Sequence, residues 1–290
     1  MSYNSPIDNA HQRAKENVKT LWRIIQSPSN SGAFNMALDE VFLSMAAQKI
    51  KPPTLRLYSW APPALSLGYS QKASDVDFQQ LEHLGWDMVR RPTGGKAILH
   101  IDELTYSISA PADNPLVSGT LLESYQRISS ILQNALSHLG VVTSADHQYT
   151  DLPENAKVNP VCFEVPSSFE ITHNSKKLIG SAQARKAGGV LQHGSLPLFG
   201  DLGRITQALH FDSEGERQTA AYKVNARAST LQQAAGRSIT WEEAARSLIL
   251  AFSAQPDIEV EMVQPDADEI QQAEELTRSK YTSPAWTNRI

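Results

Sequence analysis

The chain has 290 residues, of which 41% are hydrophobic and 20% charged, a composition typical of a globular protein with a buried core. Its formal net charge of -5 gives no basic footprint for neutralising phosphates, so no nucleic acid is expected as a partner. A single cysteine excludes an internal disulfide framework, and because no apolar run is long enough for a signal peptide or a membrane span, we expect a cytoplasmic protein with no membrane contact.

The first quarter of the chain predicts a tail, a helix and two short strands. Residues 1–19 are polar and lack a pattern, which indicates a mobile tail. Apolar residues recur at helical spacing over 34–45, and a Pro-Pro pair closes this segment. Leucines then alternate with other residues at 55–57 and at 65–67, on either side of a proline-rich turn, which predicts one strand on each side.

The next stretch predicts two helices with strands between them. A short helix is expected between Asp77 and Gly85, with its apolar stripe made by Phe78, Leu81 and Leu84. A strand at 88–89 leads into a polar, glycine-bearing loop, and alternation at 104–108 predicts the strand that follows this loop. The clearest helix is expected over 120–139, with a capping box at its start and a glycine at its end.

The second half of the chain predicts a long loop, then strands, then helices. Residues 144–168 are rich in Asp, Asn, Pro and Ser and lack periodicity, so Cys162 is expected in or just after a loop. Turns at Asn174-Ser175 and Gly188-Gly189 separate the strands, and capping boxes begin the helices. The expected elements are the strands 169–173, 177–182 and 190–198 and the helices 240–253 and 266–281.

The first candidate site is the segment RRPTGGKAILH at residues 90–100. Glycines between strands let a backbone approach a ligand closely, and bare N–H groups can receive an anion or a carbonyl oxygen. A plain hairpin turn contains the same glycine pair, so the segment alone does not establish a site. Its spacing matches neither the dinucleotide fingerprint nor the Walker A pattern.

The second candidate site is Cys162, which lies between proline-bearing turns in NPVCFEVPSSFE. A lone cysteine is either a small buried hydrophobic residue or a nucleophile. Fifteen positions later, Lys177 opens the segment KLIGSAQAR, whose small residues Gly180, Ser181 and Ala182 suit the wall of a tight site. A lysine is usually solvated, but an ammonium beside a thiol favours the thiolate. The residues alone leave both interpretations open.

Histidines and serines add no independent site. The sequence around His193, LQHGSLPL, leaves three interpretations open: a proton carrier, a hydrogen-bond donor or a buried core residue. His100, His147 and His173 form no metal-ligand spacing, so no metal is expected. The chain contains no G-x-S-x-G pattern, which argues against a serine hydrolase.

Four segments together resemble the lipoate-protein ligase and octanoyltransferase superfamily, in the order typical of that family. They are GAFNMALDE, RRPTGGKAILHIDELTYSI, CFEVPSSFEI and NSKKLIGSAQARKAGGVLQHGSL. The third is similar to the cysteine-dependent octanoyltransferases within the superfamily. The resemblance implies an α/β (α+β) fold shared with biotin protein ligases, with a mixed, largely antiparallel sheet flanked by helices. We expect a catalytic domain over 20–255 and a C-terminal helical extension over 256–290 packed on it.

The resemblance also implies roles for individual residues. Cys162 matches the acyl-thioester nucleophile, and Lys177 matches the lysine that holds the thiolate and polarises the acyl carbonyl. The chain departs from the ligases at Lys96, where they carry a third glycine, which argues against adenylate binding. The implied lining of the acyl site is Arg91, Thr93, Gly94, Gly95, His100, Gly180, Ser181, Gln183, His193 and Gly194.

The implied reaction is the first step of lipoate biosynthesis. The thiolate attacks the octanoyl thioester of acyl carrier protein, and a lysine of an acceptor, the glycine cleavage H protein or a lipoyl domain, then takes the octanoyl group as an amide. A thioester is converted to an amide in a downhill step, so neither ATP nor a cofactor is required. Burial of roughly six methylenes contributes about 5 kcal/mol to binding, and pocket depth would set the chain length.

Three other functions remain open at the level of sequence. An ATP-dependent lipoate ligase would activate free lipoate with Mg²⁺ and would need no cysteine, so Cys162 and Lys96 argue against it. An amidotransferase would take the octanoyl group from the H protein through the same kind of cysteine, and residues separate it poorly from the first reaction. A catalytically silent acyl-binding or regulatory protein on the same fold is disfavoured by the presence of both Cys162 and Lys177.

Overall fold

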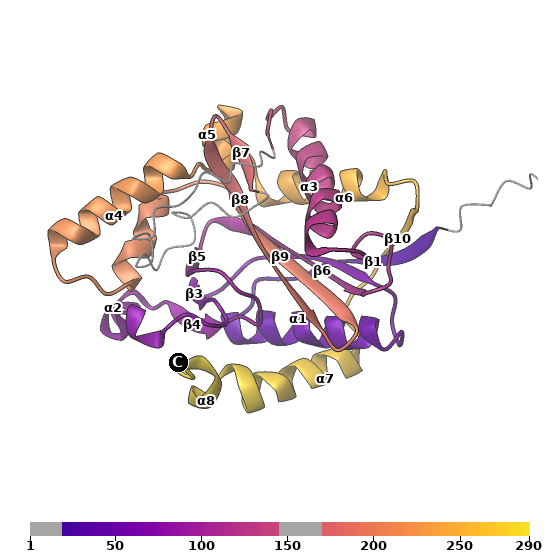
Figure 1. The fold of residues 1–290 in the computed structure, drawn as a ribbon, viewed down its shortest axis with the longest axis horizontal. Coiled ribbons are helices and arrows are strands. Elements are labelled where there is room, and N and C mark those ends of the chain that lie inside the picture. Colours follow the sequence, from indigo (N-terminus) through magenta and orange to yellow (C-terminus); the bar gives the residue numbers. More distant parts are fainter. Residues whose placement is uncertain (1–18, 145–169) are drawn as a thin grey trace, which may run out of the picture.

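The computed structural model describes residues 19–144 and 170–290, and a seven-stranded mixed sheet lies at its centre (Figure 1). The strand order is β10-β1-β2-β6-β9-β8-β7, with β1 parallel to both β10 and β2 and the other pairs antiparallel. The mixed, largely antiparallel sheet expected from the sequence is confirmed. Its strands are β1 (Thr20–Gln26), β2 (Thr54–Tyr58), β6 (Glu103–Pro111), β7 (Ile171–His173), β8 (Lys176–Lys186), β9 (Gly189–Pro197) and β10 (Ile258–Met262).

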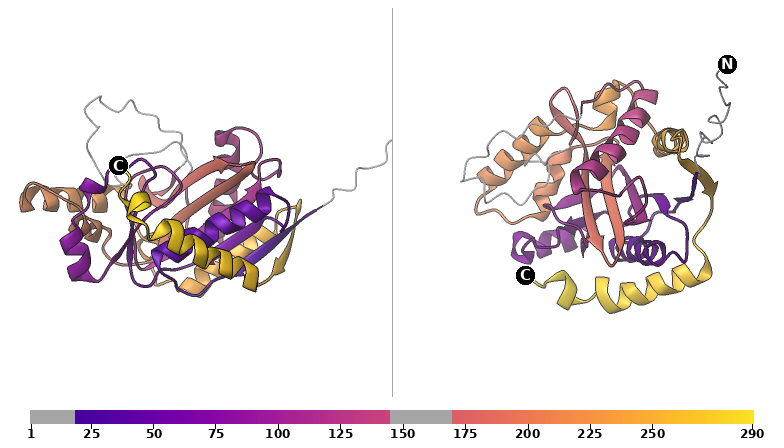
Figure 2. Two further views of the ribbon diagram at one scale, coloured as in Figure 1. Left: turned by 90° about the horizontal axis from the view of Figure 1, so that it is seen from below. Right: turned by 45° about the vertical axis from the view of Figure 1, so that its right-hand side comes forward.

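Helices cover both faces of this sheet because its strands carry apolar side chains on both sides. On one face lie α3 (Leu121–His138) and α6 (Trp241–Ser253), which pack on Ile24 and on the edge of the Trp22 ring. On the other face α1 (Gly32–Ala47) packs on Ile25, and α7 (Ala267–Leu276) lies alongside α1 (Figures 1 and 2). Alternate residues of one strand thus serve two different cores.

A second, three-stranded sheet stands beside the large one. Its order is β4-β3-β5, and the strands are β3 (Ala64–Leu67), β4 (Asp87–Arg90) and β5 (Ile98–His100). Apolar residues of α2 (Phe78–Leu84), α4 (Glu214–Arg227) and the 3₁₀ segment η3 (Leu202–Ala208) pack with this sheet in a core of its own. The two strands expected at 55–57 and 65–67 are both present, but they belong to different sheets, and β5 was not expected.

Local sequence signals place the helix ends well. The helix expected over 120–139 is α3, whose N-cap Thr120 and residue Glu123 form the capping box, and Gly140 follows it with φ 80°. The short helix is α2, capped by Asp77 and ended by Gly85 with φ 65°. The prediction of its apolar stripe was partly wrong, because Phe78 lies in the first turn and its side chain is 47% exposed. The helix expected at 240–253 is α6, with its capping box at Thr240.

The strands expected after the long loop are confirmed, with one shift. Asn174 and Ser175 both have positive φ, and they form the tight turn between β7 and β8 as expected. The next turn is Ala187-Gly188 rather than Gly188-Gly189, because Gly189 already pairs with Lys186 as the first residue of β9. A Cβ on Gly189 would lie 2.7 Å from Leu43 Cδ1 of α1, so that glycine is required for close packing.

The C-terminal part contributes a strand as well as helices. The helix expected at 266–281 begins at α7 with the Asp266 capping box and continues as the π-helical segment η4 (Thr277–Tyr281), followed by α8 (Pro284–Thr287). Besides β5, several elements along the chain were not expected: the strands β1 and β10, the helices α4, α5 (Leu231–Ala235) and α8, and the 3₁₀ segments η1 (Ala73–Asp75) and η3. The boundary at 255 stays a prediction. The expected tail and Cys162, with nearly all of its loop, lie outside the described residues.

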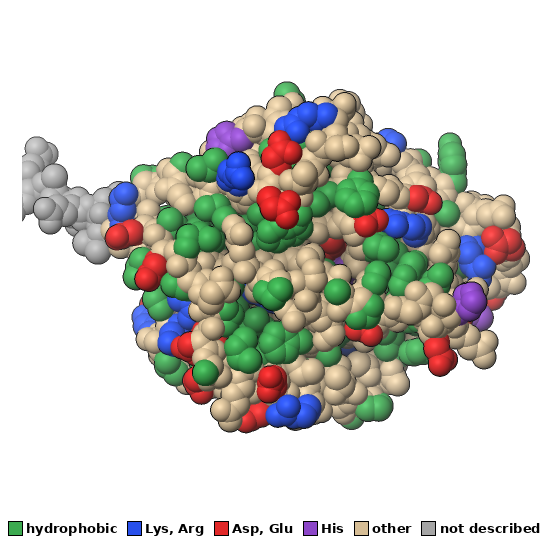
Figure 3. Space-filling view, turned by 180° about the vertical axis from the view of Figure 1, so that it is seen from behind, with side chains coloured by type: hydrophobic (Ala, Val, Ile, Leu, Met, Phe, Trp, Pro, Cys, Tyr) green, Lys and Arg blue, Asp and Glu red, His purple; other side chains and the backbone are tan. Residues whose placement is uncertain are grey.

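The surface of the described part carries mixed charges. On the face drawn in Figure 3, Lys and Arg side chains alternate with Asp and Glu and no broad field of one sign is formed. Among the described helices, none is both long enough and apolar enough to cross a membrane.

Candidate active site

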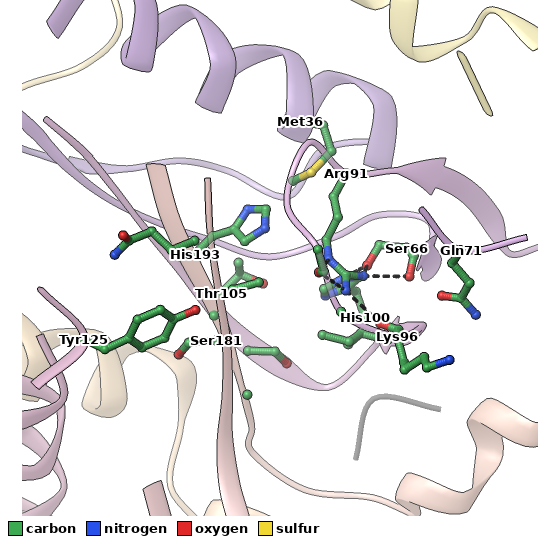
Figure 4. Close-up of a pocket in the computed structure, with 18 of the residues that line it drawn as sticks. Met36, Ser66, Gln71, Arg91, Lys96, His100, Thr105, Tyr125, Ser181 and His193 are labelled. Atoms are coloured by element: carbon green, nitrogen blue, oxygen red, sulfur yellow. Dashed lines mark hydrogen bonds between the residues drawn. The ribbon is translucent and has the colours of Figure 1, made fainter. Parts of the chain in front are cut away.

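A cavity of about 770 Å³ lies between the two sheets (Figure 4). One wall comes from β8 and β9, and the facing wall comes from β3, β5 and the loop that joins β4 to β5. The start of α3 adds Leu121, Leu122 and Tyr125 at the rim. The cavity thus joins segments that are about a hundred residues apart in the chain.

The residues implied by the family resemblance come together around this cavity. Thr93 lies directly behind the wall, where its Oγ1 is 2.6 Å from Nε2 of His193. Cys162 lies outside the described residues. The remaining residues line the cavity: Arg91, Gly94, Gly95, His100, Lys177, Gly180, Ser181, Gln183, His193 and Gly194.

Arg91 holds the glycine-bearing loop in place. Its guanidinium donates to the carbonyl oxygens of Gly94 and Lys96 at 2.7 and 2.8 Å and to the carbonyl and hydroxyl of Ser66 at 3.0 and 3.1 Å. Gly95 adopts φ 95°, and its carbonyl oxygen would lie 1.9 Å from a Cβ placed on Gly68. The loop is therefore pressed against the neighbouring segment, and only glycine fits at either position.

His100 is oriented by a buried carboxylate that the sequence analysis did not identify. Nδ1 of His100 donates to Glu103 Oε1 at 2.8 Å, and Thr105 and Ser195 also donate to this carboxylate. With the hydrogen on Nδ1, the other nitrogen accepts from Ser66 Oγ at 2.8 Å. The Trp60 ring stacks on the imidazole at 3.9 Å and donates through Nε1 to Thr105.

Replacing Glu103 with glutamine should destabilise this wall. The amide group would direct N–H atoms at partners that are themselves donors, and a buried unsatisfied donor costs about 1–3 kcal/mol. We expect a Glu103→Gln variant to show a lower free energy of unfolding in urea, whereas Glu82→Gln on the exposed face of α2 should leave it unchanged. Equal stability of the two variants would contradict this account of the Glu103 contacts.

His193 lies between the cavity and a buried ion pair. Below it, Asp39 of α1 accepts from Arg56 at 2.9 Å, Tyr58 at 2.8 Å and Ser107 at 2.8 Å, and Asp39 and Arg56 are fully buried. Burial opposes ionisation of Asp39, but the Arg56 guanidinium and the His193 and Ser107 contacts hold its pKa below the usual value. Burial lowers the pKa of His193, against the raising effect of Asp39, so the imidazole is neutral near pH 7.

The geometry selects one tautomer of His193. Nδ1 lies 3.7 Å from Asp39 Oδ2 and has no hydrogen-bond partner among the described residues. The negative charge of Asp39 favours the hydrogen on Nδ1, and Nε2 then accepts from Thr93. Asp39 thereby connects the signature segment on α1 to the glycine-bearing loop through one histidine.

The small residues of β8 and β9 meet a tyrosine from β6. Tyr106 and Ser181 are hydrogen bonded at 2.7 Å, and Gln192 donates to the tyrosine oxygen at 3.0 Å. Burial raises the pKa of Tyr106 to about 12, so its hydroxyl stays protonated at neutral pH. A Cβ on Gly194 would lie 2.5 Å from the Tyr106 ring, which explains the glycine at that position. Gln183 donates to Gln192 and to Ser124 of α3, both at 2.9 Å.

Lys177 presents a buried ammonium to the cavity. Its side chain is 4% exposed, and Nζ donates to Glu170 Oε1 at 2.5 Å. The backbone of Lys177 also forms a bridge to Ala228, and its carbonyl accepts from Ser229. These contacts fix the position of the Lys177 ammonium in the cavity wall. In the sequence, Lys177 follows Cys162 by fifteen positions.

The residues missed from sequence were Asp39, Glu103, Trp60, Thr105 and Ser195. A signal existed only for Asp39, a carboxylate at a helix position flanked by Leu38 and Val41 of the buried face. Glu103 and Thr105 lie in β6 and Ser195 lies in β9, and the residues around them in the sequence do not indicate that these side chains contact one another. In the described ranges, no group of three or more His, Cys, Asp or Glu side chains is arranged to hold a metal ion.

Comparisons with known proteins agree in sequence and in structure. Residues 31–253 match the family model described as the lipoyl protein ligase A/B catalytic domain. Octanoyltransferase LipM of Carboxydothermus hydrogenoformans is 36% identical to this chain over 270 residues, covering 93% of the chain and 99% of that relative. Octanoyltransferase LipM of Kyrpidia tusciae is 37% identical over 275 residues, covering 92% and 98%.

Among solved structures, a bi-partite lipoate protein ligase of Thermoplasma acidophilum has a TM-score of 0.75 at 21% identity, covering 93% of this chain and 96% of that chain. A lipoate-protein ligase A bound with ATP has a TM-score of 0.73 at 21% identity, with coverages of 92% and 98%. At this identity the structures establish the shared fold. The sequence matches show that the chain belongs to the lipoyl protein ligase A/B catalytic domain family, in its LipM octanoyltransferase branch.

Proposed function

We propose that this chain transfers an octanoyl group from octanoyl-acyl carrier protein, through a thioester on Cys162, to a lysine of a lipoyl-accepting protein. The acceptor is the glycine cleavage H protein or a lipoyl domain, and the reaction is the first step of lipoate biosynthesis. Membership of the octanoyltransferase branch supports octanoyl transfer by this enzyme. The identity of the donor, the covalent intermediate on Cys162 and the identity of the acceptor are our proposals.

The observation that carries the proposal is the position of Lys177. Its side chain is 4% exposed, lines the cavity and is held by an ion pair with Glu170, and a charge that is buried and oriented in a cavity wall is typical of a functional site. A thiolate beside it is stabilised by the charge, and so is the oxyanion that forms on the acyl carbonyl. Lys177 thus suits both steps of acyl transfer to and from a cysteine.

The chemistry consists of two substitutions at one carbonyl carbon. The Cys162 thiolate forms a bond to that carbon, the donor thioester bond breaks, and the released donor thiolate takes up a proton. The amine of the acceptor lysine then forms the amide bond, the bond to Cys162 breaks, and the amine loses a proton. No step requires ATP, so we propose no cofactor. Apolar side chains from the start of α3, Leu121, Leu122 and Tyr125, are in the lining and suit the acyl chain.

We also propose that residues 20–255 form the catalytic domain and 256–290 an extension packed on it, in a cytoplasmic enzyme. In support of the division, every described residue that lines the cavity precedes residue 255. The extension is held to the domain by an Arg23–Glu269 ion pair of 2.6 Å and by Tyr281 and Lys280, which both donate to Glu40.

Intact-protein mass spectrometry tests the proposed function. After incubation with octanoyl-acyl carrier protein and no ATP, the wild-type enzyme should gain the mass of one octanoyl group, and the Cys162→Ser variant should gain none as a thioester. Addition of an acceptor should remove the adduct from the enzyme and place it on the acceptor. Activity that appears only with ATP and free octanoate, with no adduct, would instead identify a ligase.

A further inference from the structure

The described wall of the cavity is cationic. Arg91, Lys96 and Lys177 line it, and no Asp or Glu is present among the described lining residues. His193 adds no charge, because burial lowers its pKa. Carboxylates lie just behind this lining, since Glu170 pairs with Lys177 and Glu103 contacts His100, and an octanoyl thioester itself is uncharged.

Two of the three cations are already engaged by the protein. Arg91 donates to carbonyl and hydroxyl oxygens of Ser66, Gly94 and Lys96, and Lys177 donates to Glu170. Lys96 is different: its half-buried side chain makes no hydrogen bond or ion pair anywhere in the part of the chain that the structure describes. Within the described part of the chain, no protein group competes with a ligand for this ammonium.

Lys96 lies at one end of the cavity. Figure 4 shows Lys96 and Gln71 at one end of the cavity, while Tyr125, Ser181 and His193 lie toward the other. Beside Lys96, a Cβ on Gly94 would meet no atom of the described residues within 4 Å. A ligand whose acyl chain occupies the Ser181 end would extend its other end toward Lys96.

We propose that Lys96 binds the phosphate of the phosphopantetheine arm that carries the octanoyl thioester. This inference rests on the proposed function, since it assigns the donor's second binding group. The arm joins a thioester to a phosphodiester through a neutral chain. A phosphodiester is an anion that an ammonium at one end of the cavity, with no partner among the described residues, can bind.

The test compares two protein-free donors that differ only in the phosphate, octanoyl-phosphopantetheine and octanoyl-pantetheine. The second-order rate constant for formation of the Cys162 adduct is measured by intact mass for wild type, Lys96→Gln, Lys96→Arg and the control Lys19→Gln, an exposed lysine before β1. A charge-assisted contact makes the wild type prefer the phosphorylated donor about tenfold or more. Lys96→Gln should lose this preference, while Lys96→Arg and Lys19→Gln retain it.

Each result has one meaning. If Lys96→Gln reacts more slowly with the phosphorylated donor alone, the phosphate site is established, and the preference should also weaken at high salt. If the variant slows both donors equally or neither, Lys96 does not bind the phosphate, and a defect seen only with whole acyl carrier protein would assign Lys96 to the acidic carrier surface instead. A wild type that forms no adduct with any octanoyl donor would overturn the proposed function itself.

Discussion

Substitution of Lys177 by alanine should reduce the rate of Cys162 acylation by about 100-fold or more, the loss expected when a preorganised group that stabilises an oxyanion is removed. The same change removes the ammonium that favours the thiolate, so the pH at which acylation becomes fast should rise. Single-turnover acylation from octanoyl-acyl carrier protein, followed by intact mass across a range of pH, measures both effects.

A matched control is available on the same strand. Lys176 is the adjacent residue of β8, but its Nζ donates to the carbonyl of Asn225 at the surface and does not line the cavity. Lys176→Ala should acylate at the wild-type rate. Because Lys177→Ala also leaves Glu170 without this ammonium, circular dichroism and thermal unfolding of both variants must show a folded protein. Normal acylation by folded Lys177→Ala would remove the role assigned to this lysine.

Replacement of Asp39 by asparagine should be the most destabilising single change beneath the cavity. The Asp39–Arg56 pair has no exposed surface on either side chain, and removal of one partner leaves a buried guanidinium uncompensated, at a cost of about 3–5 kcal/mol. Denaturant unfolding at pH 7 measures the loss. Asp113→Asn, which breaks an exposed pair with Lys49, serves as the control and should change stability little.

The effect of Asp39 should also depend on pH. Its folded-state pKa lies below the ordinary value of 3.8, because the Arg56 guanidinium and the hydrogen bonds outweigh burial. A carboxylate with a depressed pKa contributes stability that is present above its unfolded pKa and is lost as the pH falls through its folded pKa. The difference between wild type and Asp39→Asn should therefore narrow below about pH 4. A constant difference from pH 7 to pH 3 would contradict this assignment.

Helix ends and hairpins were predicted well because their signals are local. A capping box satisfies backbone donors within four residues, so Thr120 and Glu123 identify the start of α3 wherever the helix packs. Glycines with positive φ end α2 and follow α3 for the same reason. The exact position of a turn depends also on contacts with distant residues. The turn after β8 lies one residue earlier than expected because Gly189 already belongs to β9 and packs on Leu43 of α1.

Long-range pairing decided what local patterns could not. Strand β5 has three residues and too little alternation to be recognised, and it exists because β3 pairs with it. The edge strand β10 likewise depends on its parallel partner β1, from the other end of the chain. Phe78 has an apolar side chain at helical spacing, yet it remains 47% exposed in the first turn of α2.

By itself, the sequence determined the fold class, several helix ends and part of the set of residues that line the cavity, because periodicity, capping and the signature segments are properties of short stretches of chain. Only the tertiary structure placed Glu103 behind His100, Asp39 behind His193 and Glu170 beside Lys177. It also showed that Lys96 has no partner among the described residues, whereas Arg91 is fully engaged by its own loop. The physical reason is that the position and charge of a buried polar group depend on its hydrogen-bond and ion-pair partners, and those partners come from strands and helices far away in the sequence.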